Sequence, residues 1–170
     1  SGTYTTIVLF FDFGTAGNGK IFYWDDVTLL PVNIAGLELP LTFESGTLNY
    51  AFTNFDGGDV TIINNPQSGG INTSAKVGKM VKNAGQPWGG SWIALDAPIS
   101  FGALRTFKMK VWSPRVGAKV LLKVENLTNG AINFEKEVTT TVANQWEELT
   151  FDYTGINVAN SYQKVVLIFD

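Results

Sequence analysis

The chain has 170 residues, of which 45% are hydrophobic, 13% aromatic and 16% charged, and its 18 glycines favour a β-rich fold with many turns. Its formal charge of -3 gives no attraction for nucleic acid, and no apolar run approaches the ~20 residues that span a bilayer, so we expect neither nucleic-acid binding nor membrane insertion. Because cysteine and histidine are absent, disulfides, thiolate or imidazole metal sites and Ser-His-Asp triads are excluded, which leaves carboxylate chemistry or rarer options for catalysis.

Two segments at opposite ends of the chain, residues 4–12 and 162–170, resemble the same β-strand. Their offset of 158 residues (170 − 12) suits one sandwich module plus a linker, and is much longer than solenoid or propeller periods. We infer a tandem array of modules; the alternative is that two unrelated core strands resemble each other. Five positions are identical: Tyr4/Tyr162, Val8/Val166, Leu9/Leu167, Phe11/Phe169 and Asp12/Asp170.

A glycine-rich turn at residues 13–20 follows the first copy and leads into residues 21–29, Ile-Phe-Tyr-Trp-Asp-Asp-Val-Thr-Leu, whose aromatic and β-branched content predicts a strand. Pro31 and Pro40 then interrupt strand pairing. We expect residues 1–30 to be the C-terminal strands of a preceding repeat, 31–40 a linker and 41–170 the main module. The segment 13–29 is expected to complete a module, by folding back within its own chain or by adding to a neighbouring molecule's sheet.

Short strands recur through the main module, separated mostly by Gly, Pro or Asn clusters, and no long stretch keeps a helical period. This spacing predicts an all-β fold, a β-sandwich jelly roll of two antiparallel sheets. The candidate strands are residues 91–96, 107–112, 119–125, 135–141, 146–152 and 164–170.

One of these strands, residues 107–112, has a polar face that carries an aromatic ring. Alternation places Phe107, Met109 and Val111 on the core face, and Lys108, Lys110 and Trp112 on the other. Indole rings stack on the apolar faces of sugars while polar side chains bind hydroxyl groups, so Trp112 and Lys110 are candidate glycan contacts. The alternative is an ordinary solvated face on which Trp112 covers a sandwich edge.

A second aromatic cluster lies in residues 82–95. Trp88 falls in a Pro/Gly turn, where burial in the core is difficult, and Trp92 falls on the strand face opposite Ile93 and Leu95. Uncharged hydrogen-bonding side chains flank them, and we assign Asn83 and Gln86 to the candidate site. One tryptophan could instead close the end of the sandwich, and Trp146 is interpreted as structural.

The carboxylates do not suggest an active site. Glu147 and Glu148 are adjacent on a strand and point to opposite faces, so they cannot form the close pair that a glycosidase needs, and we expect no enzyme activity. Glu44 near the module start and Asp25 or Asp26 near a module end would meet if the first and last strands are neighbours. Such oxygen ligands suit a structural calcium ion.

Four stretches together resemble carbohydrate-binding modules of the family 4, 9 and 22 type, as repeated in marine Bacteroidetes surface proteins and secreted glucanases. They are Phe-Glu-Ser-Gly at 43–46, Asn-Thr-Ser-Ala-Lys-Val-Gly-Lys at 72–79, Gln-Trp-Glu-Glu-Leu-Thr-Phe at 145–151 and the closing strand at 22–29. The closing motif stands here at the N-terminal end, as the repeat interpretation requires.

The resemblance implies a galactose-binding-like jelly roll that binds polysaccharide without cleaving it, with calcium held between Glu44 and Asp26 or Asp25. We expect a secreted or cell-surface protein whose ligand is a β-glucan such as laminarin, bound by Trp88, Trp92 and Trp112. The alternative function is a structural spacer of an adhesin or extracellular fibre, in which neighbouring repeats or separate copies exchange strands.

Overall fold

The computed structural model describes Val8, Ile21, Tyr23, Asp25 and residues 36–170. The chain divides into two compact units, residues 1–34 and 35–170, and this division falls within the expected 31–40 linker. The first copy of the duplicated strand, the glycine-rich turn and the strand expected at 21–29 lie outside the described residues, apart from these four positions. Their predicted structure therefore stays a prediction.

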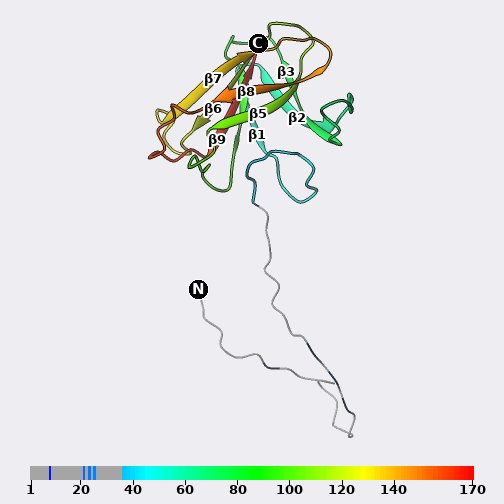
Figure 1. The fold of residues 1–170 in the computed structure, drawn as a ribbon, viewed down its shortest axis with the longest axis vertical. Coiled ribbons are helices and arrows are strands. Elements are labelled where there is room, and N and C mark those ends of the chain that lie inside the picture. Colours follow the sequence, from blue (N-terminus) through cyan, green and yellow to red (C-terminus); the bar gives the residue numbers. More distant parts are fainter. Residues whose placement is uncertain (1–7, 9–20, 22, 24, 26–35) are drawn as a thin grey trace. The chain divides into compact units, whose positions relative to one another are not determined.

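All regular elements in residues 36–170 are β-strands, which confirms the all-β prediction (Figure 1). No helix long and apolar enough to cross a membrane occurs in the described part of the chain. The strands are β1 (Phe52–Phe55), β2 (Gly58–Asn64), β3 (Lys76–Lys82), β4 (Gly90–Ala94), β5 (Thr106–Trp112), β6 (Lys119–Glu125), β7 (Asn133–Thr139), β8 (Trp146–Asp152) and β9 (Lys164–Phe169).

The strands form an antiparallel β-sandwich. One layer is a five-stranded sheet in the order β1-β4-β9-β6-β7, and the other side holds two separate pairs, β2-β3 and β5-β8. The register aligns inward residues across the five-stranded sheet, so that Ile93, Val165 and Val124 form one buried row. The finer assignment, a jelly roll, stays a prediction.

Two apolar clusters form the core between the layers. The larger one packs Val111, Leu149 and Phe151 of the β5-β8 pair against Val120, Leu122 and Val124 of β6. The smaller one joins Leu37, Ile93, Leu95 and Val165. Ile99 and Leu167 pack against both clusters, so the core is continuous.

Candidate functional site

The β5-β8 pair presents a polar outer face, as the alternation of residues 107–112 predicts. Val111 is buried, whereas Lys108 and Lys110 are exposed. The antiparallel register sets Lys110 opposite Glu148, and Trp112 opposite Trp146. Because directly opposed residues point to the same side of a sheet, these side chains share one face.

Trp112 and Trp146 meet at one end of this face. Their ring centroids lie 5.9 Å apart with an interplanar angle of 69°, an edge-to-face contact. The indole Nε1 of Trp146 donates a hydrogen bond of 2.7 Å to the carbonyl oxygen of Gln67, in the loop between β2 and β3. We call these two residues the tryptophan pair; both rings are half-buried, so each keeps part of its surface in solvent.

Charged side chains continue the outer face away from the tryptophan pair. Lys108 Nζ donates to Glu148 Oε1 at 2.6 Å, and these side chains are 63% and 40% exposed. An ion pair in such contact with water contributes little to stability. Its polar atoms are therefore available at the surface beside Lys110.

The loop between β3 and β4 carries Trp88, whose surface is 57% exposed. Its Nε1 donates to Asp56 Oδ2 at 3.0 Å, and the backbone N–H of Gln86 donates to the Asp56 carbonyl at 3.1 Å. Asn83 and Gln86 are exposed in the same loop. The turn at Asp56 thus orients this loop while the Trp88 ring faces solvent.

Trp92 lies on β4 and points away from the core, opposite the buried Ile93. Lys164 Nζ lies 4.9 Å from its ring centroid, a cation–π contact. Lys164 also approaches Glu125 at 3.3 Å, and Glu125 approaches Lys123 at 2.9 Å. A network of ion pairs therefore partly covers Trp92.

The predicted tryptophans do not share one groove. Trp92 lies on the outer face of the five-stranded sheet, whereas Trp112 lies on the outer face of the β5-β8 pair. Since the inner faces of these layers pack against each other, the two rings point to opposite sides of the sandwich. Trp112 meets Trp146 instead, which sequence reasoning interpreted as structural. No local signal in the sequence shows this contact, because it depends on the register of β5 against β8.

The predicted calcium ligands belong to different units or lie outside the described residues. Glu44 Oε1 accepts a hydrogen bond from the backbone N–H of Lys76 at 3.0 Å. Asp26 lies outside the described residues, and Asp25 belongs to the other unit. In the part of the chain that the structure describes, no group of three or more acidic side chains is arranged to hold a metal ion. The calcium site stays a prediction.

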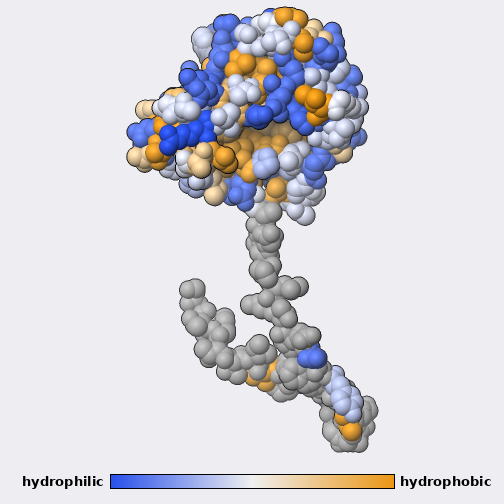
Figure 2. Space-filling view, viewed as in Figure 1, coloured by the Kyte–Doolittle hydropathy of each residue, from blue (hydrophilic) through white to orange (hydrophobic). Residues whose placement is uncertain are grey.

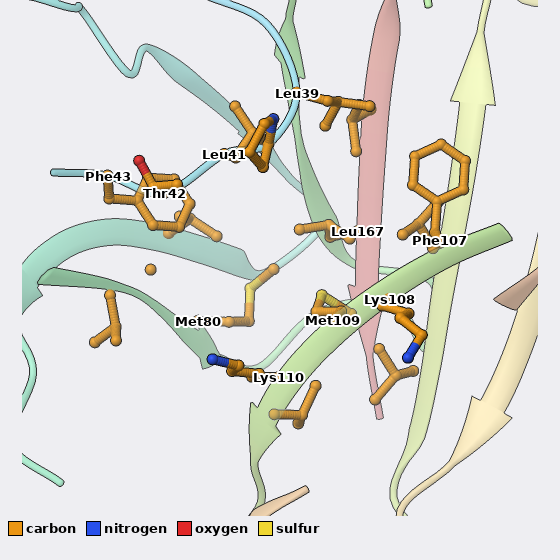
Figure 3. A pocket seen from close by; sticks show the side chains of 18 of the residues that line it. Leu39, Leu41, Thr42, Phe43, Met80, Phe107, Lys108, Met109, Lys110 and Leu167 are labelled. Carbon is orange, nitrogen blue, oxygen red and sulfur yellow. The ribbon is translucent and has the colours of Figure 1, made fainter. Parts of the chain in front are cut away.

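A large groove that sequence reasoning missed opens into the sandwich. Its volume is about 1380 Å³, and its lining is mainly apolar (Figures 2 and 3). Met80 of β3, Phe107 and Met109 of β5 and Leu167 of β9 all line it. Alternation correctly assigns Phe107 and Met109 to the inner face, but it does not show that β3 and β5 fail to pair above them.

The comparisons identify no relative of this chain: no family model matches it, and no curated protein matches it.

Proposed function

We propose that residues 36–170 form a non-catalytic polysaccharide-binding module that uses the outer face of the β5-β8 pair. The observation that carries this proposal is the tryptophan pair, in which Trp112 and Trp146 stand together beside Lys110 and Glu148. The resemblance to carbohydrate-binding modules favours a β-glucan such as laminarin, bound by a secreted or cell-surface protein.

The chemistry of this face suits a sugar chain. Indole rings contact the apolar faces of pyranose rings, and lysine and carboxylate groups bind hydroxyl groups as donors and acceptors. A row of residues along two paired strands repeats every second residue, about 6.6–6.8 Å, so an extended ligand would meet several side chains. Trp88, with Asn83 and Gln86, offers a separate exposed contact on the β3–β4 loop.

The carboxylates near this face support binding without cleavage. Glu147 accepts hydrogen bonds from the backbone N–H of Thr141 at 3.0 Å and from its hydroxyl at 2.8 Å. Glu148 is paired with Lys108. Being sequence neighbours on β8, the two carboxylates point to opposite sides of the strand.

Calorimetric titration with laminarin, mixed-linkage glucan, xylan and alginate tests the proposal. We expect one β-glucan to bind, and Trp112→Ala and Trp146→Ala each to weaken its binding about tenfold or more, because buried aromatic anchors carry most of the affinity in such interfaces. Trp92→Ala is the matched control, since it removes the same ring type from the opposite sheet.

Two results would contradict this assignment. The first is no heat of binding with any of the four polysaccharides. The second is an equal loss of affinity in Trp92→Ala, which would show that the outer face of the β5-β8 pair is not the binding surface.

A structural spacer is the second candidate function, and the groove favours it. A sandwich with an open apolar groove between strand edges is suited to accept a strand from another copy, as strand-exchanging repeats do.

A further inference from the structure

The groove is bounded by two strand edges. Within residues 36–170, β3 pairs only with β2, and β5 pairs only with β8. Every residue of β5 lines the groove, as do the consecutive residues Lys76–Met80 of β3, whereas β2 and β8 contribute only two residues each. A strand lines a groove with consecutive residues when its edge, and not one of its faces, is turned toward it. The unpaired backbone groups of β3 and β5 therefore face the same opening.

The floor of the groove is the inner face of the five-stranded sheet. Val120, Leu122, Val165, Leu167 and Phe169 line it. Leu167 and Phe169 are only half-buried, although they belong to the central strand β9. Figure 2 shows this apolar hollow bordered by hydrophilic residues. Such a surface is expected to gain stability when an apolar strand covers it.

One added β-strand would pair with both strand edges and would cover the apolar floor. It would take the hydrogen bonds that β3 and β5 leave open and would join the two pairs into a single sheet in the order β2-β3-added strand-β5-β8. The second layer of the sandwich would then have five strands, like the first. The groove therefore lies at the position that one further strand of this layer would take.

The segment Ile21–Leu29 has the composition of that strand. It has no proline or glycine, and its alternate positions hold Ile21, Tyr23, Asp25, Val27 and Leu29, so four of the five side chains on this face would cover the apolar floor. Ile21 is 74% exposed and Tyr23 is 91% exposed, so their apolar surface is largely uncovered. The segment also carries Asp25 and Asp26. The groove is lined by five lysines and three acidic residues, so its lining has a net positive charge: Lys76, Lys79, Lys82, Lys108 and Lys110, with Glu38, Glu148 and Asp170.

Chain order indicates the module to which the segment belongs. Ile21–Leu29 follows Tyr4–Asp12, the first copy of the duplicated strand, through the turn at 13–20. The module in residues 36–170 already contains β9 at the centre of its sheet. By sequence order, the segment therefore belongs to a different copy of the module from the one that follows it.

We propose that the groove between β3 and β5 accepts the Ile21–Leu29 segment of a second copy of this chain as an added β-strand. This proposal does not depend on polysaccharide binding, because it rests on the open strand edges and the apolar floor, although Trp112 and Trp146 also line the groove.

Sedimentation velocity of the full chain gives the first test. We expect a species of twice the 18.5 kDa chain mass that increases with protein concentration. Val27→Pro should abolish this species, because proline removes a backbone donor and disrupts strand pairing. Val8→Pro is the matched control outside the donated segment and should leave the dimer intact. A wild-type chain that stays monomeric across the concentration range would overturn the proposal.

Cysteine cross-linking gives the second test, and the absence of native cysteine makes it specific. We would mix the single variants Tyr23→Cys and Met109→Cys, treat them with a short bismaleimide and count only dimers that contain one of each. Leu127→Cys, exposed on the loop after β6, replaces Met109→Cys as the control acceptor. We expect Tyr23→Cys to form the cross-linked mixed dimer with Met109→Cys and not with Leu127→Cys.

The same reagent separates the two sources of the strand. In the double variant Tyr23→Cys/Met109→Cys, a cross-linked monomer in place of a dimer would place the chain's own segment in the groove and overturn the second-copy assignment. Equal cross-linking to Leu127→Cys would overturn insertion into the groove. Either failure leaves the calorimetric test of polysaccharide binding unaffected.

Discussion

At the scale of single residues, Tyr153 connects the two layers of the core. It is fully buried, and its ring centroid lies 4.7 Å from that of Phe107 and 5.1 Å from that of Phe134. Its hydroxyl donates a hydrogen bond of 2.6 Å to the carbonyl oxygen of Leu122 on β6. One side chain thus packs against both layers and holds a polar contact inside the apolar core.

Tyr153→Phe tests the value of that hydrogen bond. The variant keeps the ring packing but removes the donor, so we expect the free energy of unfolding in urea to fall by about 1–3 kcal/mol, the cost of leaving a buried group without its partner. Tyr50→Phe is the control, because the Tyr50 hydroxyl makes only a 3.4 Å contact with the Ser45 amide. Equal losses in both variants would contradict this role for Tyr153.

The stability of the same variant is expected to depend on alkaline pH differently from that of the wild-type chain. Burial raises the pKa of Tyr153 well above its ordinary value of 10.0. A raised folded-state pKa contributes stability that is present below the unfolded pKa and is lost as pH rises beyond it. We therefore expect urea unfolding above pH 10 to show a steeper loss of stability in the wild-type chain than in Tyr153→Phe. Parallel pH profiles would argue against this contribution.

Residue-level reasoning predicted which side of β5 faces the core, but not which residue meets Trp112. Alternation along one strand depends only on local backbone geometry, so the inward positions of Phe107, Met109 and Val111 follow from the sequence alone. The contact between Trp112 and Trp146 depends on the register of β5 against β8, two strands separated by more than thirty residues. That register is a tertiary property.

At the scale of elements, β4 and β9 approach closely at Gly90. A Cβ atom on Gly90 would lie 2.4 Å from the Leu167 carbonyl oxygen and 2.8 Å from Ile168 Cγ1. The backbone carbonyl of Leu167 cannot move away as the end of a flexible side chain can. Gly90 therefore allows β4 to pair at this point with β9, the central strand of the sheet.

Gly90→Ala is expected to destabilise the module by about 1–3 kcal/mol, the usual cost of overpacking a well-packed site. Thermal unfolding followed by far-UV circular dichroism measures this loss. Gly102→Ala is the matched control, because a Cβ there would meet nothing within 4 Å. If Gly90→Ala melted at the same temperature as Gly102→Ala, the close approach of β4 and β9 would be contradicted.

Element-level prediction found the strands from β4 to β9 within two residues at each end but missed β1, β2 and β3. The missed strands are short or lack strict alternation: β3 reads Lys-Val-Gly-Lys-Met-Val-Lys, with three lysines and a glycine. Their backbone ladders form without an alternating pattern of side chains. The pair Asp56-Gly57, with φ values of 48° and 94°, was the available turn signal between β1 and β2.

At the scale of the whole molecule, composition and strand spacing were enough to predict an all-β sandwich, but not where its surfaces lie. Separating Trp92 from Trp112 required knowing that β4 and β5 belong to opposite layers. The groove was missed for a similar reason, because the open edges of β3 and β5 depend on the order of strands in a sheet.

The whole module is expected to unfold in one transition despite its two apolar clusters. Ile99 and Leu167 pack against both clusters, and β9 supplies residues to both, so neither cluster can lose its packing without exposing apolar surface of the other. Small domains with a continuous core usually unfold cooperatively.

We expect urea transitions followed by tryptophan fluorescence and by far-UV circular dichroism to coincide in the wild-type chain. The same agreement is expected in Trp92→Phe, where the remaining tryptophans report mainly on other parts of the module. Separate midpoints for the two probes would show that the clusters unfold independently, and would mean that Leu167 and Ile99 do not couple them.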